Sequence, residues 1–153
     1  LLIAAYRDSG NEARANEVIA QWAETDPENP EALLALAEVK VQQHDFAGAE
    51  DLYGKIAKLS PEGAHKMFYN TGASILNQRG VTADDRKRAV AAFRKAVELK
   101  PDYAKAHVRL GDALVGLGQM AEAVTHYKKF LELAPDDLEA PKIQAMVQAL
   151  SGQ

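Results

Sequence analysis

Four prolines recur along the 153-residue sequence at intervals of 34, 40 and 34 residues: Pro27, Pro61, Pro101 and Pro135. Four alanines recur at the same three intervals: Ala15, Ala49, Ala89 and Ala123. Two residue types that share one period indicate internal repeats of one structural unit. A unit of about 34 residues is too small to bury its apolar side alone, so we expect neighbouring units to stack on one another.

Each repeat has the pattern of a helix, a turn and a second helix. Apolar residues follow each alanine at helical spacing up to the closing proline, among them Tyr53, Phe93 and Tyr127, which we expect in the core. Upstream lies another helical segment that carries a small residue, namely Ala37, Gly72 or Gly111, where two helices can approach closely. Turn-forming residues such as Gly80, Gly116 and Gly118 separate the paired segments.

The segments FYNTGASI and AVAAFRKAVELKP resemble the two halves of the tetratricopeptide repeat. This family has a 34-residue unit with an aromatic residue, a small residue, a second alanine and a closing proline. The resemblance implies an all-α, right-handed superhelical solenoid that forms a single domain over residues 1–153. Its parts are a partial repeat at 1–29, repeats at 30–64, 65–103 and 104–137, and a capping helix at 138–150.

The sequence departs from the family pattern in three places. An insertion of about five residues near 79–88 lengthens the third repeat, where Thr82 and Asp85 can cap a helix that starts one turn early. Pro141 is tolerable in the first turn of the last helix, whose apolar residues would cover the end of the stack: Ile143, Met146, Val147 and Leu150. The chain opens at about the sixth position of a repeat, which leaves Leu1, Leu2 and Ile3 without a preceding neighbour, so we expect a piece of a longer protein.

In this family the first helix of each repeat lines a concave surface, and the resemblance implies that the exposed residues of these helices form a peptide-binding groove. By matched positions the groove residues are Leu34, Glu38, Val41, Lys66, Tyr69, Asn70, Leu76, Lys105, Val108, Arg109 and Asp112. Apolar residues mixed with charges of both signs are typical of a surface that binds an extended or helical peptide. Tyr69 and Tyr6 are the aromatic residues that we expect to meet a ligand.

Some family members hold the C-terminal carboxylate of their ligand with five polar residues. Asn70, Lys105 and Arg109 match the last three positions, but Leu34 and Glu38 stand at the first two. Because Glu38 would repel the carboxylate, the sequence argues against a working clamp. We expect Arg109 and Lys105 to pair instead with acidic neighbours such as Asp112 or Glu139, or with an acidic side chain of the ligand.

Composition and charge argue against several other functions. The formal net charge is -4 and no run of basic residues is present, so nucleic acid is a poor candidate partner. No stretch has the roughly 18 apolar residues of a membrane span. The sequence has no cysteine, which excludes disulfides and thiolate chemistry but leaves the cellular compartment open.

Neither catalysis nor cofactor binding has a candidate residue. The four histidines lack the spacing of a metal site: His44, His65, His107 and His126. We expect His107 to be a packed imidazole and His44 to lie in a solvated turn. The adjacent acidic pairs Asp84-Asp85 and Asp136-Asp137 do not face one another on a helix, and their place at helix starts suits the helix dipole.

The leading hypothesis is an adaptor or scaffold module that binds a peptide or protein segment in its groove and has no enzymatic activity. The alternative is a structural spacer or assembly element that associates with missing repeats or a second copy through the N-terminal edge, Leu1 to Ile3. A regulatory domain attached to an enzyme elsewhere in a longer chain is compatible with either. The identity of the ligand stays open, because one fold hosts many partners.

Overall fold

The computed structural model describes residues 2–152, and within this range it contains nine α-helices and no strand. The chain forms two compact units, residues 1–64 and 65–153. Unit 1 contains α1 (Leu2–Asp8), α2 (Glu12–Thr25), α3 (Pro30–Gln42) and α4 (Phe46–Leu59). Unit 2 contains α5 (Ala64–Leu76, apart from its first residue), α6 (Ala83–Leu99), α7 (Ala104–Val115), α8 (Met120–Leu133) and α9 (Ala140–Ser151).

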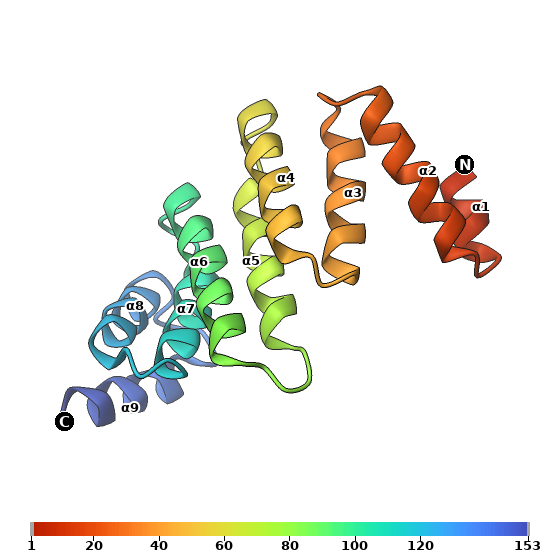
Figure 1. The fold of residues 1–153 in the computed structure, drawn as a ribbon. Coiled ribbons are helices and arrows are strands. Elements are labelled where there is room, and N and C mark those ends of the chain that lie inside the picture. Colours follow the sequence, from red (N-terminus) through yellow and green to blue (C-terminus); the bar gives the residue numbers. More distant parts are fainter. Residues whose placement is uncertain (1, 153) are drawn as a thin grey trace. The chain divides into compact units, whose positions relative to one another are not determined.

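Successive helices pair as hairpins, as the repeat pattern predicts. Figure 1 shows α3 and α4 as one antiparallel hairpin of unit 1, and α5 and α6 as one of unit 2. In unit 1, α2 also packs against α3. In unit 2, α7 packs against both α6 and α8, and α9 packs against α8. The all-α architecture of helical hairpins inferred from the sequence is therefore confirmed.

The residues that recur with the repeat form the core. The four periodic alanines are completely buried, and the periodic aromatic residues Tyr53, Phe93 and Tyr127 are buried as predicted. Trp22 on α2 is only partly buried.

Two glycines allow the helices of a hairpin to pack directly on an aromatic ring. A Cβ atom added at Gly72 would lie 2.7 Å from Cε1 of Phe93, and one added at Gly111 would overlap the ring of Tyr127. These distances are well below van der Waals contact, so no side chain fits at either position unless the ring moves. The predicted close approach at Gly72 and Gly111 is confirmed.

Local signals fix where two unusual helices begin. Thr82 and Asp85 form a capping box at the start of α6, in which each side chain accepts from the other residue's backbone N–H. As a result α6 has 17 residues, compared with 14 in α4 and α8, as expected from the insertion. Pro141 lies in the first turn of α9, whose Ile143 and Val147 are buried.

The N-terminal edge is open in the part of the chain that the structure describes. Leu1, which the sequence places at this edge, lies outside the described residues. Leu2 is 57% exposed, and α1 has no buried residue. None of the helices within residues 2–152 combines the length and the apolar character needed to cross a membrane.

Replacing Gly111 or Gly72 with alanine should destabilise the protein, although alanine is the better helix former. The added methyl group must displace Tyr127 or Phe93, and overpacking of this kind costs about 1–3 kcal/mol. Chemical denaturation of both variants would measure this change in the free energy of unfolding.

Gly54→Ala is the matched control, because a Cβ atom at Gly54 meets nothing within 4 Å. This substitution in α4 should stabilise the protein by about 0.5–1 kcal/mol. Equal effects of all three substitutions would contradict the role assigned to Gly72 and Gly111.

Candidate functional site

The first helices of the two hairpins in unit 2, α5 and α7, carry most of the residues predicted to meet a ligand. Lys66 and Asn70 on α5 and Lys105 and Arg109 on α7 are exposed. Tyr69, Leu76 and Asp112 are partly buried. The predicted residues of α5 and α7 thus reach the surface, with one exception.

Val108 is the exception, because only 3% of its surface is exposed. Seven of the 12 residues of α7 are buried, so most of this helix belongs to the interior of unit 2. The prediction that Val108 faces a ligand was therefore wrong. From sequence alone, an aliphatic residue in the first helix of a repeat can face either a groove or the core. In the structure, α7 packs against both α6 and α8, and Val108 is buried.

Arg109 lies at the centre of the polar contacts on this surface. Its Nη1 is 3.3 Å from Oδ2 of Asp112, one turn along α7, which confirms the predicted pair. Tyr69 of α5 lies close enough to interact with its guanidinium group. Burial alone lowers the pKa of Arg109, but the interactions with Tyr69, Asp112 and Glu139 outweigh it and raise the pKa.

Asp112 connects this surface to the core. Its Oδ1 accepts a hydrogen bond of 2.8 Å from the hydroxyl group of Tyr127, while its Oδ2 faces Arg109. Burial and the hydrogen bond to Asp112 raise the pKa of Tyr127, so the phenol stays protonated and can donate. The buried ring that packs on Gly111 therefore also orients the carboxylate beside Arg109.

Aromatic side chains form a cluster next to Arg109. The ring centroid of Tyr69 lies 5.3 Å from that of Tyr103 and 5.8 Å from that of Phe93. His65 contacts the other side of the cluster, with its ring centroid 5.0 Å from that of Tyr103 in an edge-to-face arrangement. Aromatic pairs at these distances are stabilising beyond the apolar area that they bury. Burial and the neighbouring Tyr69 raise the pKa of Tyr103.

Tyr103 was not among the residues predicted from the sequence, although a signal was present. The residue two positions after each closing proline is Asn29, Gly63, Tyr103 or Asp137, so an aromatic residue occurs in one repeat alone. An aromatic residue that breaks the repeat pattern in a turn is a candidate for a contact outside the common core. Its actual neighbours, Tyr69 and His65, are on another helix, which sequence spacing does not reveal.

The remaining predicted site residues lie on α3 of unit 1. Glu38 is exposed, whereas Leu34 and Val41 are partly buried. These residues share a helix with the buried Ala32, Leu33, Ala37 and Val39. Tyr6, the other aromatic residue predicted to meet a ligand, is partly buried on α1.

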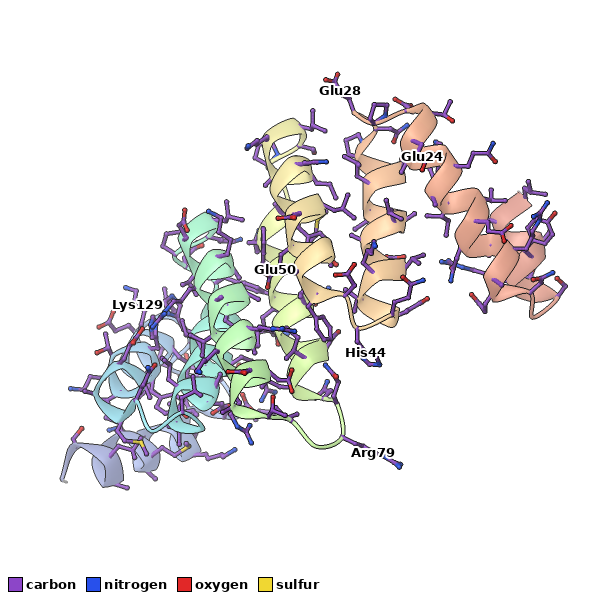
Figure 2. All side chains as sticks on the ribbon, in the orientation of Figure 1. Glu24, Glu28, His44, Glu50, Arg79 and Lys129 are labelled. Atoms are coloured by element: carbon purple, nitrogen blue, oxygen red, sulfur yellow. The ribbon has the colours of Figure 1, made fainter. Side chains whose placement is uncertain are left out.

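The histidines do not form a metal centre. No group of three or more histidine, cysteine or acidic residues within residues 2–152 is arranged to hold a metal ion. His107 is buried as predicted, with 6% of its surface exposed. His44 is exposed and, as Figure 2 shows, projects from the turn between α3 and α4.

Two family models match the sequence, and both describe the tetratricopeptide repeat. One covers residues 6–68 and the other residues 81–137. Among curated proteins, the chain is 51% identical over 92 residues to the Hsp70-Hsp90 organizing protein of Triticum aestivum, which corresponds to 60% of this chain and 15% of that protein. It is 30% identical over 89 residues to heat shock protein STI1 of Saccharomyces cerevisiae, which corresponds to 58% and 14%. The chain thus spans a small part of the length of these relatives.

Solved structures share the fold. The crystal structure of MamA superposes with a TM-score of 0.68 at 21% identity, covering 99% of this chain and 85% of that one. YrrB, described as a TPR protein with an unusual peptide-binding site, superposes with a TM-score of 0.62 at 20% identity, covering 98% and 74%. Helical hairpins with a repeating aromatic-on-glycine core define an α-helical repeat protein of the solenoid class. The chain belongs to the tetratricopeptide repeat family.

The hydrogen bond between Tyr127 and Asp112 should contribute measurably to stability. In a double-mutant cycle of Tyr127→Phe and Asp112→Ala, we expect a coupling energy of about 1–3 kcal/mol, because the acceptor is charged and the donor is buried. Urea denaturation of the two single variants and the double variant would measure it.

An Arg109→Ala, Tyr127→Phe cycle is the control, since Arg109 and Tyr127 share Asp112 as a partner and have no hydrogen bond to each other. Its coupling energy should be clearly smaller. A Tyr127–Asp112 coupling near zero would show that the hydroxyl group does not hold the carboxylate.

Proposed function

We propose that the chain is a protein-interaction module, an adaptor or scaffold that binds a peptide or protein segment on the exposed face of α5 and α7. The observation that carries the proposal is the cluster of Tyr69 on α5, Tyr103 in the turn before α7 and Arg109 on α7, which places aromatic and cationic groups near one another. Aromatic residues and arginine are the side chains that most often dominate binding energy at protein interfaces.

The polar residues around the cluster are suited to bind the backbone carbonyl groups and acidic side chains of a peptide. Lys66, Asn70 and Lys105 are exposed around it, and neither lysine forms an ion pair within residues 2–152. Exposed ammonium and amide groups can bind carbonyl oxygens or acidic side chains of a peptide. On α3 of unit 1, we still predict ligand contacts for Leu34, Glu38 and Val41.

We do not assign a C-terminal carboxylate clamp to this surface. Arg109 is already paired with Asp112, and Glu38 and Leu34 replace two of the polar residues that a clamp needs. We therefore propose that the ligand is an internal segment of a protein and that no C-terminal carboxylate takes part in binding.

The related proteins support binding rather than catalysis. The wheat relative is named as an organizer of Hsp70 and Hsp90, and YrrB is a TPR protein with a peptide-binding site. Protein or peptide is thus the ligand class that we propose for this chain. Which protein it binds does not follow from a family whose members share one fold and bind different partners.

A second candidate function is self-association or docking through α1. It is favoured by one observation, the absence of any buried residue on α1, where Leu2 is 57% exposed. This function predicts that oligomeric state depends on concentration and on Leu2, and that it is indifferent to Tyr69 and Arg109. Sedimentation of the wild type and of Leu2→Ser separates it from peptide binding.

A peptide library displayed with free and with amidated C-termini tests the leading proposal. The wild-type protein should enrich a consistent motif, and the motif should be the same in both libraries. Tyr69→Ala with Arg109→Ala should weaken binding of the enriched peptides at least about tenfold, because truncating central aromatic and arginine residues has effects of this size.

Arg79→Ala is the matched control, since Arg79 is exposed and projects outward from the turn between α5 and α6 (Figure 2). It should bind like the wild type, and circular dichroism should show that all variants are folded. The proposed surface would be contradicted if the Tyr69, Arg109 double variant enriched the same peptides as the wild type, or if the wild type enriched no peptide.

A further inference from the structure

Charge is distributed unevenly between the two units. Unit 1 contains 12 acidic and 5 basic residues, whereas unit 2 contains 10 acidic and 13 basic residues. The formal charges are therefore -7 for unit 1 and +3 for unit 2, a difference that the net charge of -4 conceals. Oppositely charged surfaces attract one another and guide the encounter of two molecules. Two copies of this chain thus present complementary charges to each other.

An acidic turn, residues 24–31, joins α2 to α3 in unit 1. Four of its eight residues are exposed carboxylates, namely Glu24, Asp26, Glu28 and Glu31. None of them forms an ion pair within residues 2–152. Glu28 projects from the turn (Figure 2) and lines a hollow with Lys55 and Lys58 of α4, without pairing with either lysine. The acidic turn therefore has carboxylates that are free to meet a cationic surface.

Hydrogen bonds and prolines restrict the conformation of the acidic turn. Asn29 caps α3, because its Oδ1 accepts a hydrogen bond of 3.0 Å from the backbone N–H of Glu31. The Nδ2 of Asn29 donates a hydrogen bond of 2.9 Å to Oδ2 of Asp26. Pro27 and Pro30 fix two further backbone angles. A segment that is ordered before binding loses little conformational entropy when it binds.

The candidate binding face of unit 2 has lysines without an acidic partner. Three lysines are exposed and form no ion pair in the part of the chain that the structure describes: Lys66, Lys100 and Lys105. Burial lowers the pKa of His65, and the nearby Lys100 and Lys66 lower it further. Asp102 has the opposite effect on this pKa. Since His65 contacts Tyr103 at a centroid distance of 5.0 Å, these lysines lie beside the aromatic cluster.

Two of these lysines lie where they do not stabilise their own helices. Lys66 and Lys105 are in the first turns of α5 and α7, and neither turn contains an acidic residue. The first turns of α2, α3, α6 and α8 each contain one or two. A cation is unfavourable near the positive end of the helix dipole. An acidic ligand beside Lys66 and Lys105 would compensate this charge.

We propose that the acidic turn of one copy binds the α5 and α7 face of a second copy, so that the chain is its own ligand. The carboxylates of the turn pair with Lys66, Lys100 and Lys105, and the apolar ring of Pro27 packs on Tyr69 and Tyr103. The turn is an internal segment, which needs no terminal carboxylate. Because the two surfaces differ, each copy can give its turn to one neighbour and receive the turn of another. The inference rests on the proposed function, since it uses the same face.

The expected association is weak and reversible. An eight-residue turn buries less than the about 1,200 Å² of surface that stable interfaces need. The pairing charges are exposed, so dissolved salt screens them. Self-association should therefore appear only as the protein concentration rises, and it should decrease as the salt concentration rises.

Sedimentation velocity over a series of protein concentrations tests the proposal. The wild type should associate, and an increase in salt from about 0.05 M to about 0.5 M should weaken the association at least about threefold. Lys66→Glu with Lys105→Glu should weaken it at least about tenfold, because acidic residues would then face the acidic turn. Glu24→Lys with Glu28→Lys should have an equal effect, because lysines would face lysines.

A mixture of these two double variants gives the decisive result. The Lys66, Lys105 variant keeps its acidic turn and the Glu24, Glu28 variant keeps its lysines, so the mixture should associate although neither variant does alone. Arg79→Glu with Lys128→Glu is the matched control, since it changes the net charge by the same amount at two other exposed positions of unit 2. It should associate like the wild type.

Three results of these experiments would overturn the proposal. The first is a wild type that stays monomeric at every concentration. The second is a mixture that does not associate, or a control variant that loses association as the Lys66, Lys105 variant does. The third is association that survives both charge reversals but is lost in Leu2→Ser, which would assign it to α1.

A synthetic peptide of residues 22–33 separates this inference from the proposed function. It should bind the wild type and compete with peptides enriched from the library. If library peptides bind and this peptide does not, the inference falls and the proposed function stands. If no library peptide binds, the proposed function fails by its own test, and the mixture of charge variants alone decides whether two copies associate in this way.

Discussion

Direct packing of an aromatic ring on a glycine is the contact on which the rest of unit 2 depends. Phe93 lies on Gly72 between α5 and α6, and Tyr127 lies on Gly111 between α7 and α8. Because a methyl group would not fit under either ring, each pair of helices is held at a fixed close distance. In the same unit, Tyr69 of α5 contacts Tyr103, the residue before α7, near Arg109.

The same contacts connect the interior to the candidate binding surface. Tyr127 has two roles, since its ring fills the space above Gly111 and its hydroxyl group fixes Asp112, the partner of Arg109. Phe93 likewise packs on Gly72 and approaches Tyr69. The surface is thus preorganised by buried residues, which reduces the entropy that a ligand must overcome on binding.

Periodicity predicted most of the fold, because the same local rule recurs in each repeat. The helical hairpins, the core alanines, the close contact at Gly111 and the capping box of Thr82 with Asp85 all follow from spacing and residue type. The inward orientation of Val108 does not, since an aliphatic residue suits either environment. Partners across helices were equally hidden, as in the pairing of His107 with His126, 19 residues away.

The sequence identified Tyr69 and the polar residues of the candidate site, but it predicted contacts between them only within one helix. Arg109 and Asp112 are one turn apart, so their pairing follows from helix geometry alone. The aromatic half of the site depends on a departure from the repeat at Tyr103 and on contacts with α5. Such contacts are set by how two hairpins pack, which spacing within one hairpin does not determine.

The central claim is that the exposed face of α5 and α7 is where a ligand binds, and chemical-shift mapping tests it most directly. A ¹⁵N-labelled sample would be titrated at neutral pH with a peptide enriched by the wild-type protein. We predict that the largest changes occur at Lys66, Tyr69, Asn70, Lys105 and Arg109. Changes concentrated instead on α1 or α9, with α5 and α7 unaffected, would contradict the claim.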